Sequence, residues 1–174
     1  MADLDLLHIS LADQMLYGFA AGRLVVRVPV SSAANGAGER NGSGRTPRGL
    51  HQVRARIGEG LPKDAVLKGR RWTGETWSAE LNEAFPGRDW ILTRILWLSG
   101  CEPGRNRMGE VDTFRRYIYL HGTPDCEPMG MPLSHGCIRL RNDDLLELFP
   151  RVPLHCRVRI EEADCPDWQA AQLN

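Results

Sequence analysis

The 174-residue sequence carries no net charge and no long apolar run. Its 22 basic side chains equal its 22 acidic ones, so no overall field attracts nucleic acid or an anionic membrane. The most apolar early stretch, residues 15–30, is interrupted by Arg23 and Arg27, and a membrane-spanning helix needs about 20 predominantly apolar residues. We therefore expect neither nucleic acid nor a membrane as a partner.

Closely spaced metal-binding residues are also missing. No two of the five cysteines form a C-x-x-C pair, and the five histidines are scattered; structural zinc sites usually take ligands in closely spaced pairs. We expect no metal and no cofactor.

The cysteines are Cys101, Cys126, Cys137, Cys156 and Cys165. An odd number cannot pair completely within one chain, which suits a reducing compartment.

A secretory signal is not visible at the N-terminus. Residues 1–5 read Met-Ala-Asp-Leu-Asp, which is acidic where a signal peptide is basic, and no uninterrupted apolar segment follows. Together with the cysteines, this predicts a cytoplasmic protein. A periplasmic location is the alternative if a signal peptide has been removed.

Alternating apolar and polar residues predict that the chain is mostly β, a β-rich α+β fold. Its length and its 42% hydrophobic content fill one core, so we expect a single domain over residues 1–174. Residues 33–49, rich in Gly, Asn, Ser and Arg, predict an exposed loop. The strands are expected at 6–11, 15–19, 23–31, 51–57, 90–98, 115–120 and 155–160.

Two segments predict helices. Residues 142–149 have an apolar stripe, two acids in the first turn and Asn142 as the capping residue. Residues 78–85 predict a short helix, the only one in the glycine-rich segment 58–89.

Cys137 has the surroundings of a reactive thiol. A thiol is a strong nucleophile only as thiolate, which requires a nearby base or cation. His121 precedes it by sixteen positions, and His135 by two, a spacing that shares a face if the chain is extended. Spacing alone leaves both as candidate bases. Gly136 permits a tight turn whose N–H groups converge, as an oxyanion hole requires.

The segments around these residues resemble the L,D-transpeptidase catalytic domain, also called the YkuD domain. They contain its His-Gly-Thr element at 121–123, its Gly-x-Pro-x-Ser-His-Gly-Cys-Ile-Arg core at 130–139 and its Asn-Asp helix start at 142–143. Thr-Pro-Arg-Gly at 46–49 resembles a further element, but Pro and Gly explain it without any function, and we interpret it as a turn. Residues 58–112 match only loosely. The resemblance implies a YkuD-like β-sandwich with one helix after the catalytic cysteine loop.

The resemblance also implies the chemistry. In that family a cysteine attacks the L-centre carbonyl of diaminopimelate in a peptidoglycan tetrapeptide stem, releases the terminal D-Ala and forms a thioester. The roles implied here are Cys137 as nucleophile, His121 as base, Ser134 and His135 in the nucleophile loop, backbone N–H groups of Gly136 and Cys137 as oxyanion donors, Arg139 at the site or on a substrate carboxylate, and Gly122 and Thr123 in substrate binding.

The fate of the thioester defines the reaction. Attack by water gives an L,D-carboxypeptidase that trims recycled muropeptides, and attack by a second stem amine gives a cross-linking L,D-transpeptidase. The acidic N-terminus, the odd cysteines and the lack of a wall-binding module favour hydrolysis. A non-catalytic peptidoglycan-binding module with an unreactive Cys137 is the alternative from another class. The oligomeric state is not predicted.

Overall fold

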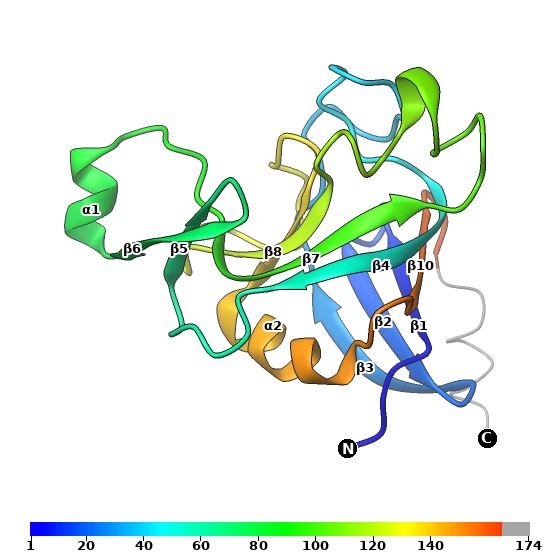
Figure 1. Cartoon of the computed structure of the whole chain (residues 1–174), viewed down its shortest axis with the longest axis horizontal. Helices are drawn as coiled ribbons and strands as arrows, with labels where there is room; N and C mark the ends of the chain where they lie inside the picture. The colour runs from blue at the N-terminus through cyan, green and yellow to red at the C-terminus, as the bar shows by residue number, and fades with distance from the viewer. Residues whose placement is uncertain (165–174) are drawn as a thin grey trace.

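Strands dominate the structure and join in one twisted sheet (Figure 1). The computed structural model describes residues 1–164, so Cys165 and the end of the expected domain lie outside it. The strands are β1 Leu6–Ser10, β2 Met15–Ala20, β3 Arg23–Pro29, β4 Gly49–Ile57, β5 Ala65–Lys68, β6 Arg71–Thr76, β7 Leu92–Gly100, β8 Tyr119–Thr123, β9 Ile138–Arg141 and β10 Arg157–Glu161. Their order is β3-β2-β1-β10-β4-β7-β5-β6, with β8 paired to β7 and β9 paired to β8. The predicted β-rich fold is confirmed.

The early hairpin follows from its turn residues. Ala21 and Gly22 separate β2 from β3, and both have positive φ, 50° and 74°. Two positive φ angles define the turn whose twist matches that of antiparallel strands. β10 pairs in parallel with β1 and antiparallel with β4, so the two ends of the described chain meet in the middle of the sheet.

A helix closes the core directly after β9. The predicted helix is α2, Asn142–Leu148, and it packs against β7, β8 and β9. Its buried Leu145 and Leu148 lie one turn apart and join the main cluster of buried side chains. Burying each such side chain stabilises the fold by about 1.5–3 kcal/mol. α2 therefore fixes β8 and β9 against the sheet.

The strand expected at 115–120 begins later than predicted. Asp112 accepts the backbone N–H of Arg115, and residues 113–117 form a turn that ends at Tyr117, where φ is 56°. A carboxylate that binds nearby N–H groups offers the backbone an alternative to a sheet ladder. His121 consequently lies inside β8 rather than beyond the end of a strand.

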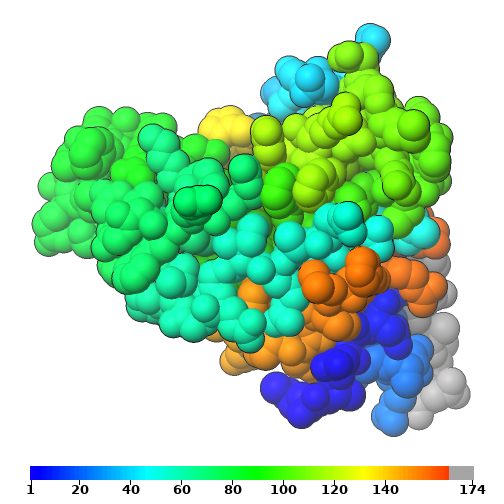
Figure 2. Space-filling model, in the orientation of Figure 1, coloured from blue at the N-terminus to red at the C-terminus, as the bar shows by residue number. Residues whose placement is uncertain are grey.

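The segment 58–89 contains more structure than its glycines indicated. It forms β5, β6 and the short helix α1, Ala79–Ala84, in which Ser78 caps the N-terminus by accepting the N–H of Leu81. β6 and α1 project from one side of the molecule, in green in Figures 1 and 2. Short 3₁₀ turns lie at Gly109–Val111 and Phe149–Arg151. None of the helices in residues 1–164 is long and apolar enough to cross a membrane.

Asn142 does not cap its helix as predicted. Arg141 occupies the cap position without a side-chain bond, and Asn142 is the first helical residue, with its amide buried. The amide nitrogen donates to the carbonyl oxygen of Thr123 at 2.8 Å and to Asp64 Oδ1 at 2.9 Å, while its oxygen accepts the Thr93 hydroxyl at 2.6 Å. This one amide therefore joins α2 to β7, β8 and the loop before β5.

Replacing Asn142 with leucine will test this connection. Asn142→Leu removes the donor to the buried Thr123 carbonyl and the acceptor of the buried Thr93 hydroxyl, so we expect the free energy of unfolding to fall by about 2–4 kcal/mol. The neighbouring Asp143→Asn is the control, because its exposed ion pair with Lys63 is worth under about 1 kcal/mol. Urea denaturation measures both, and equal effects would contradict the role of Asn142.

Candidate active site

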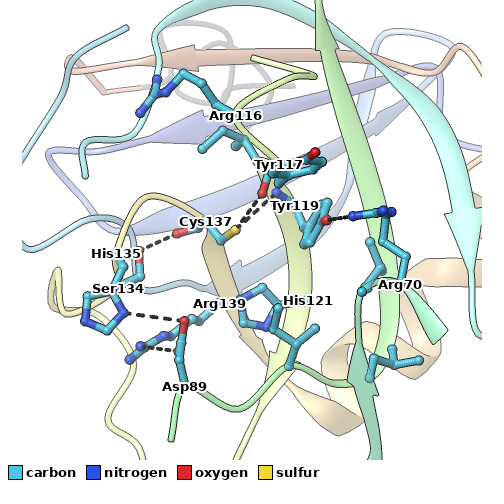
Figure 3. A pocket seen from close by; sticks show the side chains of 15 residues that line it. Arg70, Asp89, Arg116, Tyr117, Tyr119, His121, Ser134, His135, Cys137 and Arg139 are labelled. Atoms are coloured by element: carbon cyan, nitrogen blue, oxygen red, sulfur yellow. Dashed lines mark hydrogen bonds and ion pairs between the residues drawn. The ribbon is translucent and has the colours of Figure 1, made fainter. Parts of the chain in front are cut away.

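Cys137 opens onto a cavity of about 310 Å³. Its walls come from the β5–β6 turn, β7, residues 116–121 and the segment 134–139 that leads into β9 (Figure 3). His121, Ser134, His135 and Arg139 line the same cavity. The structure thus brings together five of the residues that the sequence singled out.

Parallel pairing of β8 with β9 accounts for this convergence. His121 lies opposite Arg139 in the register, and Leu120 lies opposite Ile138. Because side chains alternate along a strand, Tyr119 and His121 point to one side of β8, and Cys137 and Arg139 point to that same side of the neighbouring chain. Figure 3 shows all four around the cavity.

The Cys137 thiol is neutral in this geometry. Its S–H donates to the Tyr117 carbonyl oxygen at 3.3 Å, and its sulfur accepts the Tyr119 N–H at the same distance. Burial raises the pKa of Cys137 to about 12. A group that both donates and accepts carries its proton, so Cys137 needs a base before it can attack.

The Tyr117 carbonyl is aimed at the sulfur by a strained backbone. The φ of Tyr117 is 56°, in the left-handed region, and its side chain is 53% exposed. For an L-residue other than glycine this conformation costs about 1–2 kcal/mol. Such strain gathers at functional sites, where the surrounding structure maintains it.

His121 is held in the form that a base requires. Its Nδ1 lies 2.7 Å from the Gly122 carbonyl oxygen, and a carbonyl only accepts, so in the neutral ring the proton is on Nδ1 and the lone pair on Nε2. Burial lowers the pKa of His121 below its ordinary value. The imidazole is therefore neutral near pH 7, and Figure 3 shows its ring on the cavity side of Cys137.

His135 points away from the sulfur. Its side chain is 76% exposed, and its Nδ1 lies 3.4 Å from Asp89 Oδ2. Asp89 Oδ1 also accepts a hydrogen bond of 3.1 Å from the buried Arg139 guanidinium, whose other nitrogen lies 4.0 Å from Glu127. The cation of Arg139 is thus largely neutralised within the chain. Nothing in the sequence marked Asp89, because it lies in the segment that matches the family only loosely.

The nucleophile loop depends on Gly136 and Ser134. Gly136 has a φ of 135°, which L side chains rarely adopt. The buried Ser134 hydroxyl donates to the Cys137 carbonyl and accepts the Gly136 N–H at 3.2 Å. The Gly136 N–H is therefore already engaged, and it could hold an oxyanion only by leaving Ser134.

Thr46 hydrogen-bonds to this loop through its side chain. Its buried hydroxyl donates to the Gly136 carbonyl oxygen at 2.9 Å and accepts the Ala33 N–H at 3.0 Å. The segment 33–49 is accordingly not all exposed, since both ends of this bond are buried. Interpreting residues 46–49 as a plain turn missed this contact, for which the Thr-Pro-x-Gly likeness was the available signal.

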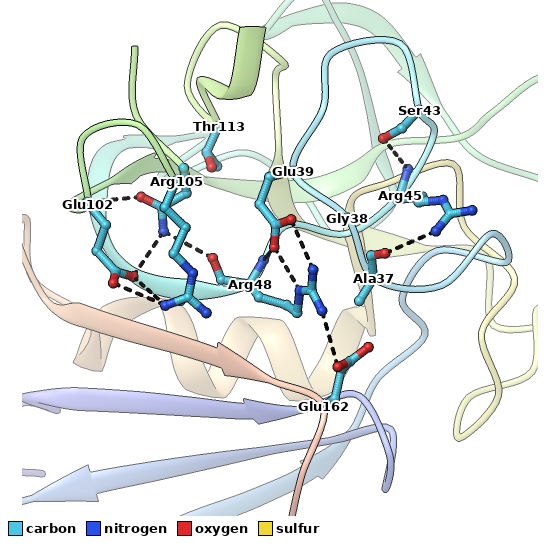
Figure 4. A network of polar contacts seen from close by, with 12 residues as sticks. Ala37, Gly38, Glu39, Ser43, Arg45, Arg48, Glu102, Arg105, Thr113 and Glu162 are labelled. Atoms are coloured by element: carbon cyan, nitrogen blue, oxygen red, sulfur yellow. Dashed lines mark hydrogen bonds and ion pairs between the residues drawn. The ribbon is translucent and has the colours of Figure 1, made fainter. Parts of the chain in front are cut away.

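Ion pairs and the half-buried Arg116 hold the segment that carries Thr46 in place. Arg48 binds Glu39 through two nitrogens, at 2.8 and 3.1 Å, and reaches Glu162 beyond β10 at 3.2 Å (Figure 4). From the other side, Arg116 donates to the carbonyl oxygens of Gly38, Glu39 and Arg45. The segment is thereby tied both to the sheet and to the turn before β8.

Gly122 and Thr123 lie behind the cavity rather than in its wall. A Cβ on Gly122 would meet Asn142 Oδ1 at 2.2 Å and the Leu92 carbonyl oxygen at 2.6 Å, so only glycine allows β7 and α2 to approach. Thr123 is buried, and its carbonyl accepts the Asn142 amide. Substrate binding by these two residues stays a prediction that this geometry does not favour.

The described chain holds no cluster of metal ligands. Within residues 1–164, no three His, Cys, Asp or Glu side chains are grouped closely enough to bind an ion. The groups that line the cavity include the thiol of Cys137 and the imidazole of His121.

Known proteins share both the sequence pattern and the fold. The model of the L,D-transpeptidase catalytic domain, YkuD, matches residues 5–160. The chain belongs to this family. A probable L,D-transpeptidase, ErfK/SrfK of Salmonella typhimurium, is 45% identical over 114 residues, which cover 59% of this chain and 37% of that protein. The probable L,D-transpeptidase YbiS of Escherichia coli K12 is 42% identical over 55 residues, covering 31% and 18%. The matches thus span well under half of either relative.

Solved structures of the family are similar in fold. An L,D-transpeptidase from Mycobacterium smegmatis has a TM-score of 0.56 at 14% identity, covering 90% of this chain and 58% of that one. L,D-transpeptidase 3 from Mycobacterium tuberculosis, solved with a faropenem-derived adduct, has a TM-score of 0.53 at 15% identity, covering 90% and 60%. At these identities the likeness establishes the YkuD-like architecture.

Alkylation at increasing pH will test the state of the thiol. With the pKa of Cys137 raised to about 12 and no imidazolium beside it, we expect its reaction with iodoacetamide to be slow at neutral pH and to accelerate beyond pH 9. The exposed Cys126 serves as the internal control. Peptide mass spectrometry reads both sites. A plateau for Cys137 near pH 7 would instead show a preformed thiolate–imidazolium pair.

Proposed function

We propose that this protein transfers acyl groups of peptidoglycan stem peptides through a thioester on Cys137. The observation that carries the proposal is that a protonated thiol and an imidazole whose free lone pair is on Nε2 line the same cavity. Membership of the L,D-transpeptidase family supports the same chemistry. The bond cleaved is the one between the L-centre of diaminopimelate and the terminal D-Ala.

The first half of the reaction forms the thioester. His121 Nε2 takes the proton from Cys137 as the sulfur attacks the carbonyl carbon, and the carbonyl electrons move onto oxygen. The Cys137 N–H, at the entrance to β9, is the backbone donor best placed for this oxyanion, since the Gly136 N–H is bound to Ser134. The tetrahedral adduct then expels the amine of D-Ala, which takes the proton from His121.

The second half requires an acceptor, and we propose water. His121 then removes a proton from water as it attacks the thioester; the carbon–sulfur bond breaks, the Cys137 sulfur takes that proton back from His121, and the stem is released as a tripeptide. Four unpaired cysteines among residues 1–164 support a reducing, cytoplasmic location, where soluble muropeptides are the available substrates. A stem amine as acceptor would make the protein a cross-linking L,D-transpeptidase in the periplasm. A binding module without turnover is the other alternative.

A tetrapeptide substrate separates these functions. We expect the protein to convert a free diaminopimelate tetrapeptide to tripeptide and D-Ala, with a transient thioester on Cys137 visible by intact-protein mass spectrometry. Cys137→Ala removes the nucleophile and should abolish both signals while the fold is retained. A dimer or an exchanged D-amino acid, when an acceptor amine is added, would establish the transpeptidase. Binding without any product would establish the module.

Variants of the two histidines identify the base. We expect His121→Gln to lower the acylation rate about 10²–10⁴-fold and His135→Gln to lower it far less, because His135 is exposed and faces Asp89. Burial lowers the pKa of His121, so the base stays neutral at pH 6.5, and the acid limb of the rate profile should lie below that pH. Single-turnover rates from pH 4 to 8 measure this. The larger loss in the His135 variant would move the base to that residue.

A further inference from the structure

Among residues 1–164, one cation in the cavity wall is neither paired with a carboxylate nor bound to backbone carbonyls. Three arginines line it: Arg70, Arg116 and Arg139. Arg139 is paired with Asp89 and Glu127, and Arg116 donates to several backbone carbonyls. Arg70 forms no ion pair with any carboxylate in residues 1–164, and its one hydrogen bond there, of 3.2 Å, goes to the Tyr119 hydroxyl.

The guanidinium of Arg70 is nevertheless held in one position. Its central carbon lies 4.7 Å from the ring centroid of Trp97 and 5.0 Å from that of Tyr117. Trp97 is itself fixed, because it stacks on Phe114 with centroids 3.9 Å apart and donates its indole N–H to the Phe114 carbonyl. Stacking occupies the faces of a guanidinium and leaves its N–H edge free to bind a carboxylate through two nitrogens.

Arg70 and the Asp89–Arg139 ion pair lie on opposite sides of the reacting groups. Figure 3 shows Arg70 on one side of Cys137 and His121, and Asp89 with Arg139 on the other. A substrate carboxylate near Asp89 would meet a negative charge, whereas near Arg70 it would meet an uncompensated positive one. Arg70 is also aligned by the β5–β6 turn, where its own φ is 63°.

We infer that Arg70, and not Arg139, binds a free carboxylate of the stem peptide and thereby positions the scissile carbonyl over Cys137. The inference rests on the proposed function and deepens it by naming a specificity determinant. Two free carboxylates of a stem ending at D-Ala belong to the residues that the scissile bond joins, namely those of the terminal D-Ala and of the D-centre of diaminopimelate. Arg70 recognises one of them, and amidated substrates distinguish which.

The test combines three substrates with three variants. The substrates are the free tetrapeptide, its C-terminal amide and its amide at the D-centre of diaminopimelate. The variants are Arg70→Gln, Arg70→Lys and, as matched control, Arg71→Gln, the exposed neighbour that lies outside the cavity wall. Glutamine at position 70 meets about the same backbone strain as arginine, because neither residue favours a positive φ. The thermal unfolding midpoint of each variant shows whether it is folded.

We expect amidation of the recognised carboxylate to lower the wild-type kcat/KM on the order of ten- to a hundredfold, mainly through KM. Arg70→Gln should lower kcat/KM for the free acid by a similar factor and process acid and amide alike. Arg70→Lys should keep part of the discrimination, and Arg71→Gln all of it.

Three outcomes would overturn a stated claim. If wild-type protein processes both amides as efficiently as the free tetrapeptide, Arg70 does not bind either carboxylate. The same follows if Arg70→Gln still discriminates between acid and amide as strongly as the wild type does. If wild-type protein releases no D-Ala and forms no thioester, the proposed function itself fails. The wild-type comparison decides between these even if a variant does not fold.

Discussion

The site depends on the parallel pairing between β8 and β9, which sets Cys137 and His121 on one side of two adjacent strands. A one-residue slip in this register would turn one of the two side chains to the opposite face. The molecule protects the register from several directions. Asn142 ties the start of α2 to the end of β8, and Gly122 admits the helix where any Cβ would collide. On the other flank, Ser31 exchanges two backbone hydrogen bonds with Arg139.

Much of this arrangement could be predicted from the sequence, since it follows from local patterns. Alternating residues indicated the strands at 15–19 and 23–31, and the Ser134-to-Arg139 motif indicated the nucleophile loop. Other features depend on residues distant in the chain. Thr46 contacts Gly136 across ninety positions, and Asp89 meets Arg139 across fifty. No periodicity records such contacts. The strand at 115–120 was placed too early, since its β-forming side chains were outweighed by the Asp112 turn.

The cavity stores its two reactive groups in their neutral forms. Burial raises the pKa of the Cys137 thiol and lowers that of the His121 imidazole, so desolvation opposes a thiolate–imidazolium pair from both sides. Moving the proton between them creates two charges that water cannot reach, and this becomes favourable only when new interactions stabilise them. A bound carbonyl supplies one, since attack passes the sulfur's negative charge to an oxygen beside a backbone N–H. Proton transfer and attack are thereby coupled. Because the thiol stays protonated when no substrate is bound, it reacts slowly with other electrophiles and oxidants.

The Asp89–Arg139 pair sets the electrostatic background for that transfer. Asp89 raises the pKa of both Cys137 and His121, and Arg139 lowers both. Because the two charges are joined by a hydrogen bond of 3.1 Å, their effects at the thiol and the imidazole largely cancel. Removing Asp89 alone would leave a bare cation that favours the thiolate but disfavours the imidazolium, whereas removing Arg139 alone would do the reverse. The pair therefore allows a buried arginine to pack beneath the site without biasing the proton.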